Sequence, residues 1–473
     1  MQQRTAHAQK SQAAPSYNRP SSTEKVVIMG TTRRDILVGL GAAMLTGPTL
    51  GHAAAVSGTR WPANFIWGVA TAAHQIEGNN VNSDYWLLEH LPFNKSKDVS
   101  GDACDSWHRW REDLALVKAL GLSAYRFSIE WARIEPEEGK FSVATLDYYR
   151  RLCAGCRELG IMPVVTFHHF TSPRWLAAKG GWENPLAAEL FARYCERATR
   201  AIGDLIGAAC TLNEPNAQVT SYVMRGYKPF EGEALLVEQA GRATGSDRFG
   251  AYFLGDSRRV RDVCLAAHAR GAQAIKSVAP SLKVGMTLAL QELQAGPGGE
   301  ALYHRVFAEA RQPFYEAAAG DDFLGVQPYL RLRTGPDGYL PVEPDATLNR
   351  HGLDARPSAL GAVIREAHTA ARVPLLVSEN GIDADDDRQR VAHLRASIDT
   401  LQGSVAAGIP LLGYMHWSLL DNYEWSSGYA PKFGLYAVDR TTFVRSPKPS
   451  AAVYRALVRA ARGRTAAAPP RLL

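Results

Sequence analysis

Eight short β-rich runs alternate with helical stretches over residues 56–463, and this alternation constrains the fold more than any other feature. The runs are rich in β-branched and aromatic residues, whereas stretches such as 105–121 repeat apolar residues at helical spacing. The runs span 65–73, 124–131, 162–170, 207–215, 283–290, 322–330, 374–382 and 411–420. Strands that alternate with helices form parallel sheets, and eight of them predict an α/β fold, a single (β/α)8 TIM barrel.

Polar and aromatic residues gather where these runs end. Barrel enzymes carry their chemistry at the C-terminal ends of the strands. We therefore expect the catalytic site at that end of the barrel. The residues collected there are Gln75, Arg126, His169, Asn213, Glu214, Tyr329, Glu379 and Trp417.

Two of these residues, Glu214 in Thr-Leu-Asn-Glu-Pro and Glu379 in Ser-Glu-Asn-Gly, each end an apolar run. A lone glutamate at a strand end more often forms a structural ion pair. Two carboxyl groups that face each other across a sugar can divide the work of glycoside cleavage. One protonates the leaving oxygen, and the other attacks the anomeric carbon. The pair therefore favours a retaining glycosidase.

These segments and their order resemble glycoside hydrolase family 1, the β-glucosidase-type barrels. The resemblance covers nearly all of residues 56–463 and rests on FIWGVATAAHQIEG, YRFSIEWARIEP, TLNEP, DFLGVQPY, VSENG and WSLLDNYEWSSGYAPKFGL. It implies a retaining β-glycosidase that hydrolyses terminal non-reducing β-D-glycosyl residues through a covalent glycosyl-enzyme intermediate.

The resemblance implies a catalytic role for five residues. Glu214 is the acid/base and Glu379 the nucleophile, while Arg126 supplies a cation. Tyr329 matches the tyrosine that hydrogen-bonds the nucleophile, and Asn213 matches the residue on the sugar 2-hydroxyl. Burial and the charge of Glu379 are expected to raise the pKa of Glu214, which has to be protonated to act as an acid.

The resemblance also implies a sugar-binding set. Hydroxyl-binding residues are Gln75, His169, Glu424 and Trp425, with Trp417 as the platform under the ring and Phe433 nearby. A pyranose has an apolar face and a polar rim, so an aromatic floor with surrounding polar groups suits it.

The Glu424-Trp425 pair indicates an unphosphorylated sugar. Family members that act on 6-phosphoglycosides lack this pair, and a carboxylate at this position would repel a phosphate. The choice among glucose, galactose and fucose stays open, because several residues share the contacts to the one hydroxyl that differs.

Four residues depart from the usual family pattern. His74 stands where Tyr or Ser is usual, Phe170 replaces the Trp after the pocket histidine, Ala209 replaces another Trp, and Gln327 replaces Asn. None of these changes removes a proton-transfer group. They leave the preference beyond the first sugar open.

Two other functions are compatible with parts of this pattern. A transglycosidase, in which an acceptor alcohol replaces water, uses the same carboxyl groups and stays open. A non-catalytic sugar-binding barrel would be favoured by loss of Glu214 or Glu379, and both are present.

His168 and His169 are adjacent in a strand and so point to opposite faces. We therefore expect no metal and no cofactor.

The expected partner is a small-molecule or oligosaccharide β-glycoside. Much of the formal net charge of +6 falls on residues 1–55, and the rest of the chain is nearly balanced, so no nucleic-acid partner is expected.

Cys153 and Cys156 have the spacing of a redox motif but lie in a helical pattern. They are predicted to be buried free thiols.

The N-terminal 55 residues contain an export signal. Arg33 and Arg34 precede a mildly apolar run over 36–50 and small residues at 53–55, which resembles a twin-arginine signal. The run is short of the ~20 residues of a membrane span and contains Pro48, so no stable membrane anchor is expected. Met29 is an alternative start. The sequence predicts export to the periplasm or medium, a barrel domain over 56–463, and a disordered tail over 464–473.

Overall fold

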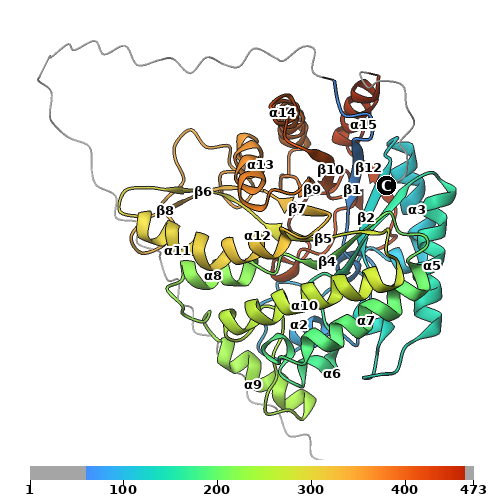
Figure 1. The fold of residues 1–473 in the computed structure, drawn as a ribbon, viewed down its shortest axis with the longest axis vertical. Coiled ribbons are helices and arrows are strands. Elements are labelled where there is room, and N and C mark those ends of the chain that lie inside the picture. Colours follow the sequence, from blue (N-terminus) through green and yellow to red (C-terminus); the bar gives the residue numbers. More distant parts are fainter. Residues whose placement is uncertain (1–59, 464–473) are drawn as a thin grey trace, which may run out of the picture. The chain divides into compact units, whose positions relative to one another are not determined.

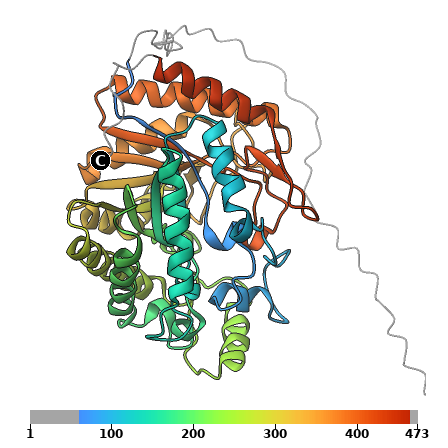
Figure 2. The same ribbon diagram turned by 90° about the vertical axis from the view of Figure 1, so that its right-hand side faces the viewer.

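The computed structural model describes residues 60–463, in which eight parallel strands close into a barrel. The strand order around the barrel is β1-β10-β9-β7-β5-β4-β3-β2. Figure 1 and Figure 2 show the helices surrounding these strands. The predicted signal over 1–55 and the predicted tail over 464–473 lie outside the described residues.

The predicted (β/α)8 barrel is confirmed, and each of the eight predicted runs contains one of its strands. They are β1 (Ile66–Ala70), β2 (Ala124–Ser128), β3 (Met162–His168), β4 (Ala208–Asn213), β5 (Lys283–Ala289), β7 (Phe323–Gln327), β9 (Leu375–Asn380) and β10 (Leu411–Trp417). Every predicted run continues past the C-terminal end of its strand. The extra residues, such as Glu214 and Tyr329, leave the sheet and enter the loops that form the site.

Eight helices follow or flank the strands on the outside. They are α3 (Ser106–Ala119), α5 (Val143–Glu158), α7 (Ala187–Ile202), α10 (Ser257–Val278), α12 (Gln312–Ala318), α13 (Ser358–Ala371), α14 (Asp387–Ala406) and α15 (Pro449–Arg462). Within residues 60–463 no helix has the length and apolar character that a membrane span requires.

The loops contain further short elements. These are α1 (Ala73–Ile76), α2 (Asp84–Glu89), α4 (Trp131–Ile134), α6 (Arg174–Ala177), α8 (Ala217–Met224), α9 (Glu233–Thr244), α11 (Glu300–Ala310), and the strand pairs β6 (Glu292–Ala295) with β8 (Arg331–Thr334) and β11 (Tyr436–Val438) with β12 (Arg445–Pro447).

Helices α7 and α10 illustrate how the outer layer packs. Phe191 and Cys195 lie on one face of α7 because they are four residues apart, and both are fully buried. A Cβ atom at Gly271 of α10 would lie 2.7 Å from the Phe191 ring, so glycine permits the close approach of the helices. The side chain of Asp256 caps α10 by accepting from the backbone N–H groups of Arg258 and Arg259.

The interior of the barrel below the site is filled by apolar side chains. Met162, Phe323, Leu376 and Met415 form a buried cluster there. A Cβ atom at Gly68 would lie 2.2 Å from the Met415 sulfur, so the glycine makes room for that side chain. Because the interior of the barrel is filled by these side chains, a ligand site can form only at the ends of the strands.

The barrel closes where the first strand meets the last. Strand β1 pairs in parallel with β10 from Ile66 opposite Gly413 to Ala70 opposite Trp417. The hydroxyl of Tyr454 in α15 donates to the carbonyl oxygen of Gly68 at 2.8 Å. The last helix of the domain, α15, is therefore hydrogen-bonded to its first strand, β1.

The cysteines of the described region are all buried and free. Cys153 and Cys156 lie on α5, and burial raises the pKa of both thiols. The prediction of free thiols in a helix is confirmed. A thiol with a raised pKa is a poor nucleophile at neutral pH.

Candidate active site

Glu214 directly follows β4, and Glu379 is the last residue but one of β9. Both line a cavity of about 300 Å³. Every predicted site residue lines this cavity except Arg126, which is fully buried beside Glu379. The fold thus gathers residues from widely separated strand ends in one place, as the sequence predicts.

The carboxyl group of Glu379 is held by three donors. Its Oε1 accepts from Arg126 Nη1 at 2.5 Å and from Gln327 Nε2 at 2.9 Å, and its Oε2 accepts from the Tyr329 hydroxyl at 2.7 Å. Burial raises the pKa of Glu379, and the guanidinium and the tyrosine oppose that rise. Charge and donors together favour the ionised form.

Glu214 has a different environment. Its carboxyl group has no hydrogen-bond partner among the described residues, and burial and the charge of Glu379 raise its pKa well above the usual range. Its backbone has a φ of 50°, which ends β4 at Asn213 and turns the chain toward the cavity. Of the two carboxyl groups, Glu214 is therefore the one that keeps a proton.

Asn213 is fixed by three donors on one oxygen. Arg126 Nη2, Gln327 Nε2 and Thr287 Oγ1 lie 2.6, 2.9 and 2.9 Å from its Oδ1. Because that oxygen faces donors, the amide nitrogen must face the other way, where it lies 3.2 Å from His169 Nε2. Asn213 therefore presents an N–H group at the cavity wall.

Aromatic rings line one side of the cavity. His169 lies between Trp417 and Trp425, at centroid distances of 5.9 and 6.1 Å and interplanar angles of 14° and 9°. The indole nitrogen of Trp417 donates to Glu424 Oε1 at 3.2 Å, and the ring of Phe433 lies 5.9 Å from that of Tyr329. Parallel rings of this kind suit the apolar face of a sugar.

Several buried polar atoms at this site have no hydrogen-bond partner among the described residues, and those of Gln75 and His169 lie on residues that line the cavity. Gln75 donates to the carbonyl oxygen of Tyr423 at 2.7 Å, but its Oε1 accepts from no described group. His169 Nδ1 is likewise buried without a partner. Buried polar atoms are normally paired, so these two are suited to the hydroxyl groups of a ligand.

Glu424 differs from the carboxylate that the sequence suggests. Burial raises its pKa to about 8, so at neutral pH the group is largely protonated and repels a phosphate less than expected. No Lys or Arg is among the described residues that line the cavity, so it offers no cation to a phosphate.

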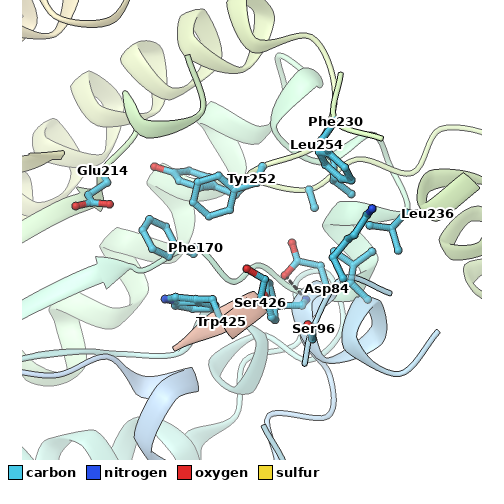
Figure 3. A pocket seen from close by; sticks show the side chains of 15 residues that line it. Asp84, Ser96, Phe170, Glu214, Phe230, Leu236, Tyr252, Leu254, Trp425 and Ser426 are labelled. Atoms are coloured by element: carbon cyan, nitrogen blue, oxygen red, sulfur yellow. Dashed lines mark hydrogen bonds between the residues drawn. The ribbon is translucent and has the colours of Figure 1, made fainter. Parts of the chain in front are cut away.

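A second cavity of about 550 Å³ lies beside the first. Phe170, Glu214 and Trp425 line both cavities. Figure 3 shows this second cavity, with Glu214 at one end and Phe230, Leu236 and Leu254 toward the other. We call it the outer chamber.

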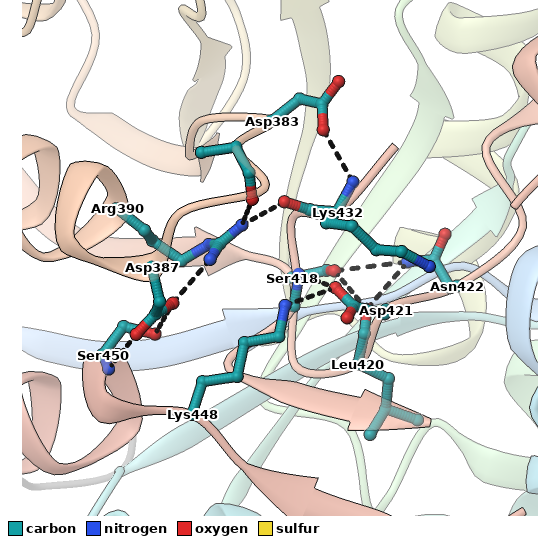
Figure 4. A network of polar contacts seen from close by, with 12 residues as sticks. Asp383, Asp387, Arg390, Ser418, Leu420, Asp421, Asn422, Lys432, Lys448 and Ser450 are labelled. Carbon is teal, nitrogen blue, oxygen red and sulfur yellow. Dashed lines mark hydrogen bonds and ion pairs between the residues drawn. The ribbon is translucent and has the colours of Figure 1, made fainter. Parts of the chain in front are cut away.

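The loop over 418–434 carries Glu424 and Trp425 and is held by one ion pair and several hydrogen bonds (Figure 4). Asp421 accepts from Lys448 Nζ at 2.7 Å and from the N–H of Gly434 at 2.9 Å. Asp383 accepts from the N–H of Lys432 at 2.6 Å. The two ends of the loop are thus joined to each other, and the loop is joined to the residue before α15 and to the segment that follows β9.

The site also contains residues to which the sequence assigned no role. Gln327 is one, and Thr287 is another. Gln291 Oε1 accepts from the N–H groups of Tyr329 and Leu330 at 2.9 and 2.7 Å and so fixes the loop that carries Tyr329. Gln327 ends β7 and Gln291 closely follows β5, so the rule that polar strand ends face the site could have identified both.

The adjacent histidines diverge, as predicted. His169 faces the cavity, whereas His168 Nε2 lies 3.0 Å from the hydroxyl of Ser172 on the other side. Over residues 60–463 no three His, Cys, Asp or Glu side chains are placed to hold one metal ion.

Comparison with known proteins adds the family context. The sequence model of "Glycosyl hydrolase family 1" matches residues 57–313 and 345–462. The unmatched segment between them contains Gln327 and Tyr329. β-Glucosidase A of Thermotoga maritima is 30% identical over 455 residues, which cover 85% of this chain and 98% of that protein.

Solved structures are similar over the same region. The crystal structure of β-glycosidase BGL167 has a TM-score of 0.82 at 48% identity, covering 87% of this chain and 99% of that one. A β-glucosidase from Thermotoga maritima in complex with glucoimidazole has a TM-score of 0.72 at 28% identity, covering 85% and 99%.

Proposed function

Because this chain belongs to glycosyl hydrolase family 1 and is a retaining β-glycosidase of the β-glucosidase type, we propose that Glu379 is its nucleophile and Glu214 its acid/base. One observation carries this assignment. Arg126 Nη1 lies 2.5 Å from Glu379, while Glu214 has no ion-pair partner among the described residues. The negative charge therefore belongs on Glu379 and the proton on Glu214.

The reaction follows from this distribution of charge. Glu379 attacks the anomeric carbon while the Glu214 carboxyl gives its proton to the glycosidic oxygen, and the bond to the leaving group breaks. Once Glu379 is esterified its charge is lost, so the pKa of Glu214 falls. The Glu214 carboxylate then accepts a proton from the water that hydrolyses the ester, which restores both groups.

The proposed substrate is a β-glycoside with a terminal unphosphorylated glucosyl residue. The unpaired atoms of Gln75 and His169, the amide of Asn213 and the carboxyl of Glu424 can pair with sugar hydroxyls. Trp417 supplies the apolar platform. The lack of a cation among the described lining residues supports an uncharged sugar.

Covalent trapping tests the assignment of the nucleophile. A 2-deoxy-2-fluoro-β-glucoside with a dinitrophenolate leaving group should label the enzyme at Glu379 alone, as read by mass spectrometry of peptides. The Glu379→Ala variant should not be labelled, because it cannot form the ester. Labelling at any other residue would show that the assignment is wrong.

The Glu214→Ala variant tests the acid/base. With an activated aryl glucoside it should still form the intermediate but should turn over slowly for lack of a base. Azide needs no base, so it should restore turnover and give the β-glucosyl azide. An α-azide product would contradict the assigned roles.

We further propose that the protein is exported in folded form by a twin-arginine-type pathway. The paired Arg33 and Arg34 before an apolar run support this proposal. Arg33→Lys with Arg34→Lys keeps the charge and should leave the enzyme in the cytoplasm, as measured by activity in cell fractions. The mature protein should begin just after residues 53–55. A mature N-terminus upstream of Arg33 would overturn the proposal.

A further inference from the structure

The outer chamber lies on the path of the leaving group. If Glu214 protonates the glycosidic oxygen, the leaving group must depart on the side that Glu214 faces. Glu214 lines both the outer chamber and the cavity of about 300 Å³ that contains Glu379, which we call the sugar cavity. The group beyond the glycosidic bond therefore enters this chamber, and its walls select that group.

The walls of the chamber are largely apolar. The Phe170 ring contacts Trp425 and Phe253 edge to face, at centroid distances of 5.1 and 4.7 Å. Phe230, Leu236 and Leu254 continue the wall away from Glu214 (Figure 3). The hydroxyls of a second sugar would lose water here without gaining enough partners, whereas an apolar ring system would gain by burial.

The polar side chains of Lys95, Ser96, Ser426 and Asp84 interrupt this wall, and of these four only Asp84 is buried. Asp84 is 1% exposed, and its Oδ1 accepts from the N–H groups of Tyr85 and Ser172 at 2.7 and 2.8 Å. Its Oδ2 is buried and has no hydrogen-bond partner among the described residues. In Figure 3 one Asp84 oxygen makes the drawn hydrogen bond and the other points into the chamber. A donor on a ligand would satisfy that oxygen.

We propose that the aglycone that enters the outer chamber is a fused-ring apolar system with a hydroxyl group at its far end that donates to Asp84. The inference rests on the proposed function, since it takes Glu214 as the acid. It makes Asp84 a specificity residue and makes disaccharides the poorer substrates.

Four glucosides separate the contributions. β-Glucosyl fluoride has no aglycone and reports on the sugar cavity alone. Cellobiose, 2-(2-naphthyl)ethyl β-glucoside and its 6-hydroxynaphthyl counterpart all release an alkyl alcohol, so leaving-group acidity does not bias the comparison. We expect kcat/KM for the naphthylethyl glucoside to exceed that for cellobiose about tenfold, with about a further tenfold gain from the hydroxyl group.

Two variants assign the gain to residues. Asp84→Asn keeps Oδ1 for its two backbone donors but replaces the acceptor Oδ2 by an amide N–H. The naphthyl hydroxyl can then no longer donate to a carboxyl oxygen, and only a neutral bond from the amide N–H to its oxygen is left, so most of the gain should be lost. Phe253→Ala should lower kcat/KM about tenfold for both naphthyl glucosides. Neither variant should change the turnover of β-glucosyl fluoride, which also shows that each variant is folded.

The possible results test the proposed aglycone separately from the proposed catalytic function. Failure of the wild type to cleave β-glucosyl fluoride would contradict the proposed function. Cleavage of the fluoride together with a preference for cellobiose, or a hydroxyl gain that survives undiminished in Asp84→Asn, would overturn the aglycone inference alone.

Discussion

Gln327 links the side-chain amide of Asn213 to the carboxylate of Glu379 at the centre of the site. Its single amide nitrogen lies 2.9 Å from both Glu379 Oε1 and Asn213 Oδ1. It therefore helps to hold Glu379, the proposed nucleophile, in its ionised form and the amide of Asn213 in one orientation. This residue departs from the asparagine that the family resemblance leads one to expect.

Gln327→Asn should weaken the nucleophile. The side chain is one methylene shorter, so it loses its reach to Glu379, and the loss of a donor raises the pKa of that carboxyl. Since the nucleophile must be ionised, the acidic limb of the kcat/KM profile should move to higher pH by about one unit. Measurement of kcat/KM against pH with an aryl glucoside checks this.

Gln312→Asn is the matched control, because Gln312 is an exposed residue whose amide contacts only Glu316. Its profile should equal that of the wild type. An unshifted acidic limb in Gln327→Asn would show that Arg126 and Tyr329 alone set the ionisation of Glu379.

The roles of single residues differ in how far the sequence predicts them. The positions of Glu214 and Glu379 at the site are predictable because each ends an apolar run within a short motif. The contacts of Gln327 cannot be predicted from the sequence, because they depend on the strand register that places this residue opposite Ala289 of β5. The raised pKa of Glu424 depends on burial by loops that only the structure describes.

Among the elements, the loop over 418–434 depends on a buried ion pair. The side chains of Asp421 and Lys448 are 7% and 15% exposed. Removing one partner of such a pair leaves a charge with little solvent, which usually costs more than the pair itself contributes. The loop that bears Glu424 and Trp425 should therefore be sensitive to Lys448.

Lys448→Met should lower the free energy of unfolding by about 3 kcal/mol and raise KM for an aryl glucoside, because Asp421 loses its cation. Guanidinium unfolding and steady-state kinetics measure the two effects. Lys179→Met is the control, since its pair with Glu138 is 48% and 37% exposed and should change stability by less than about 1 kcal/mol. Equal losses in the two variants would contradict a special role for the buried pair.

The strands of the barrel were predictable as elements, but the strands of its loops were not. The barrel runs span eight to ten residues each, are mostly apolar and alternate with helical patterns, so they can be identified from the sequence. β6 and β8 have four residues each, pair with one another, and consist of Glu-Leu-Gln-Ala and Arg-Leu-Arg-Thr. Such short polar segments become strands through tertiary pairing rather than through local sequence.

In the molecule as a whole, buried carboxyl groups make stability depend on pH. Burial raises the pKa of Glu130 to about 8 and those of Glu77 and Asp84 to about 7. A carboxyl group with a raised pKa in the folded state binds its proton more tightly there than in the unfolded chain. Its contribution to stability is complete below its ordinary pKa of 4.5 for Glu130 and is lost as the pH rises toward 8.

Glu130→Gln should therefore flatten the pH dependence of stability. Between pH 5.5 and 7.5 the free energy of unfolding of the wild type should fall more steeply than that of the variant, by up to about 1.4 kcal/mol per pH unit. The glutamine amide can still pair with the Thr171 hydroxyl, which lies 2.7 Å from the glutamate. Guanidinium unfolding at a series of pH values measures both slopes, and parallel slopes would show that Glu130 does not titrate in this range.

The seam between β1 and β10 has a consequence for biosynthesis. A ribosome releases the first strand early, yet that strand has no neighbour on one side until Leu411–Trp417 has emerged, and Gly68 has no contact with Tyr454 until α15 follows. Until then the nascent chain is an open sheet with two unpaired edges and lacks Trp417, which lines the cavity that holds Glu214 and Glu379. Such an enzyme becomes active only after its synthesis is complete, and truncation within the last helix should give a chain that chaperones retain.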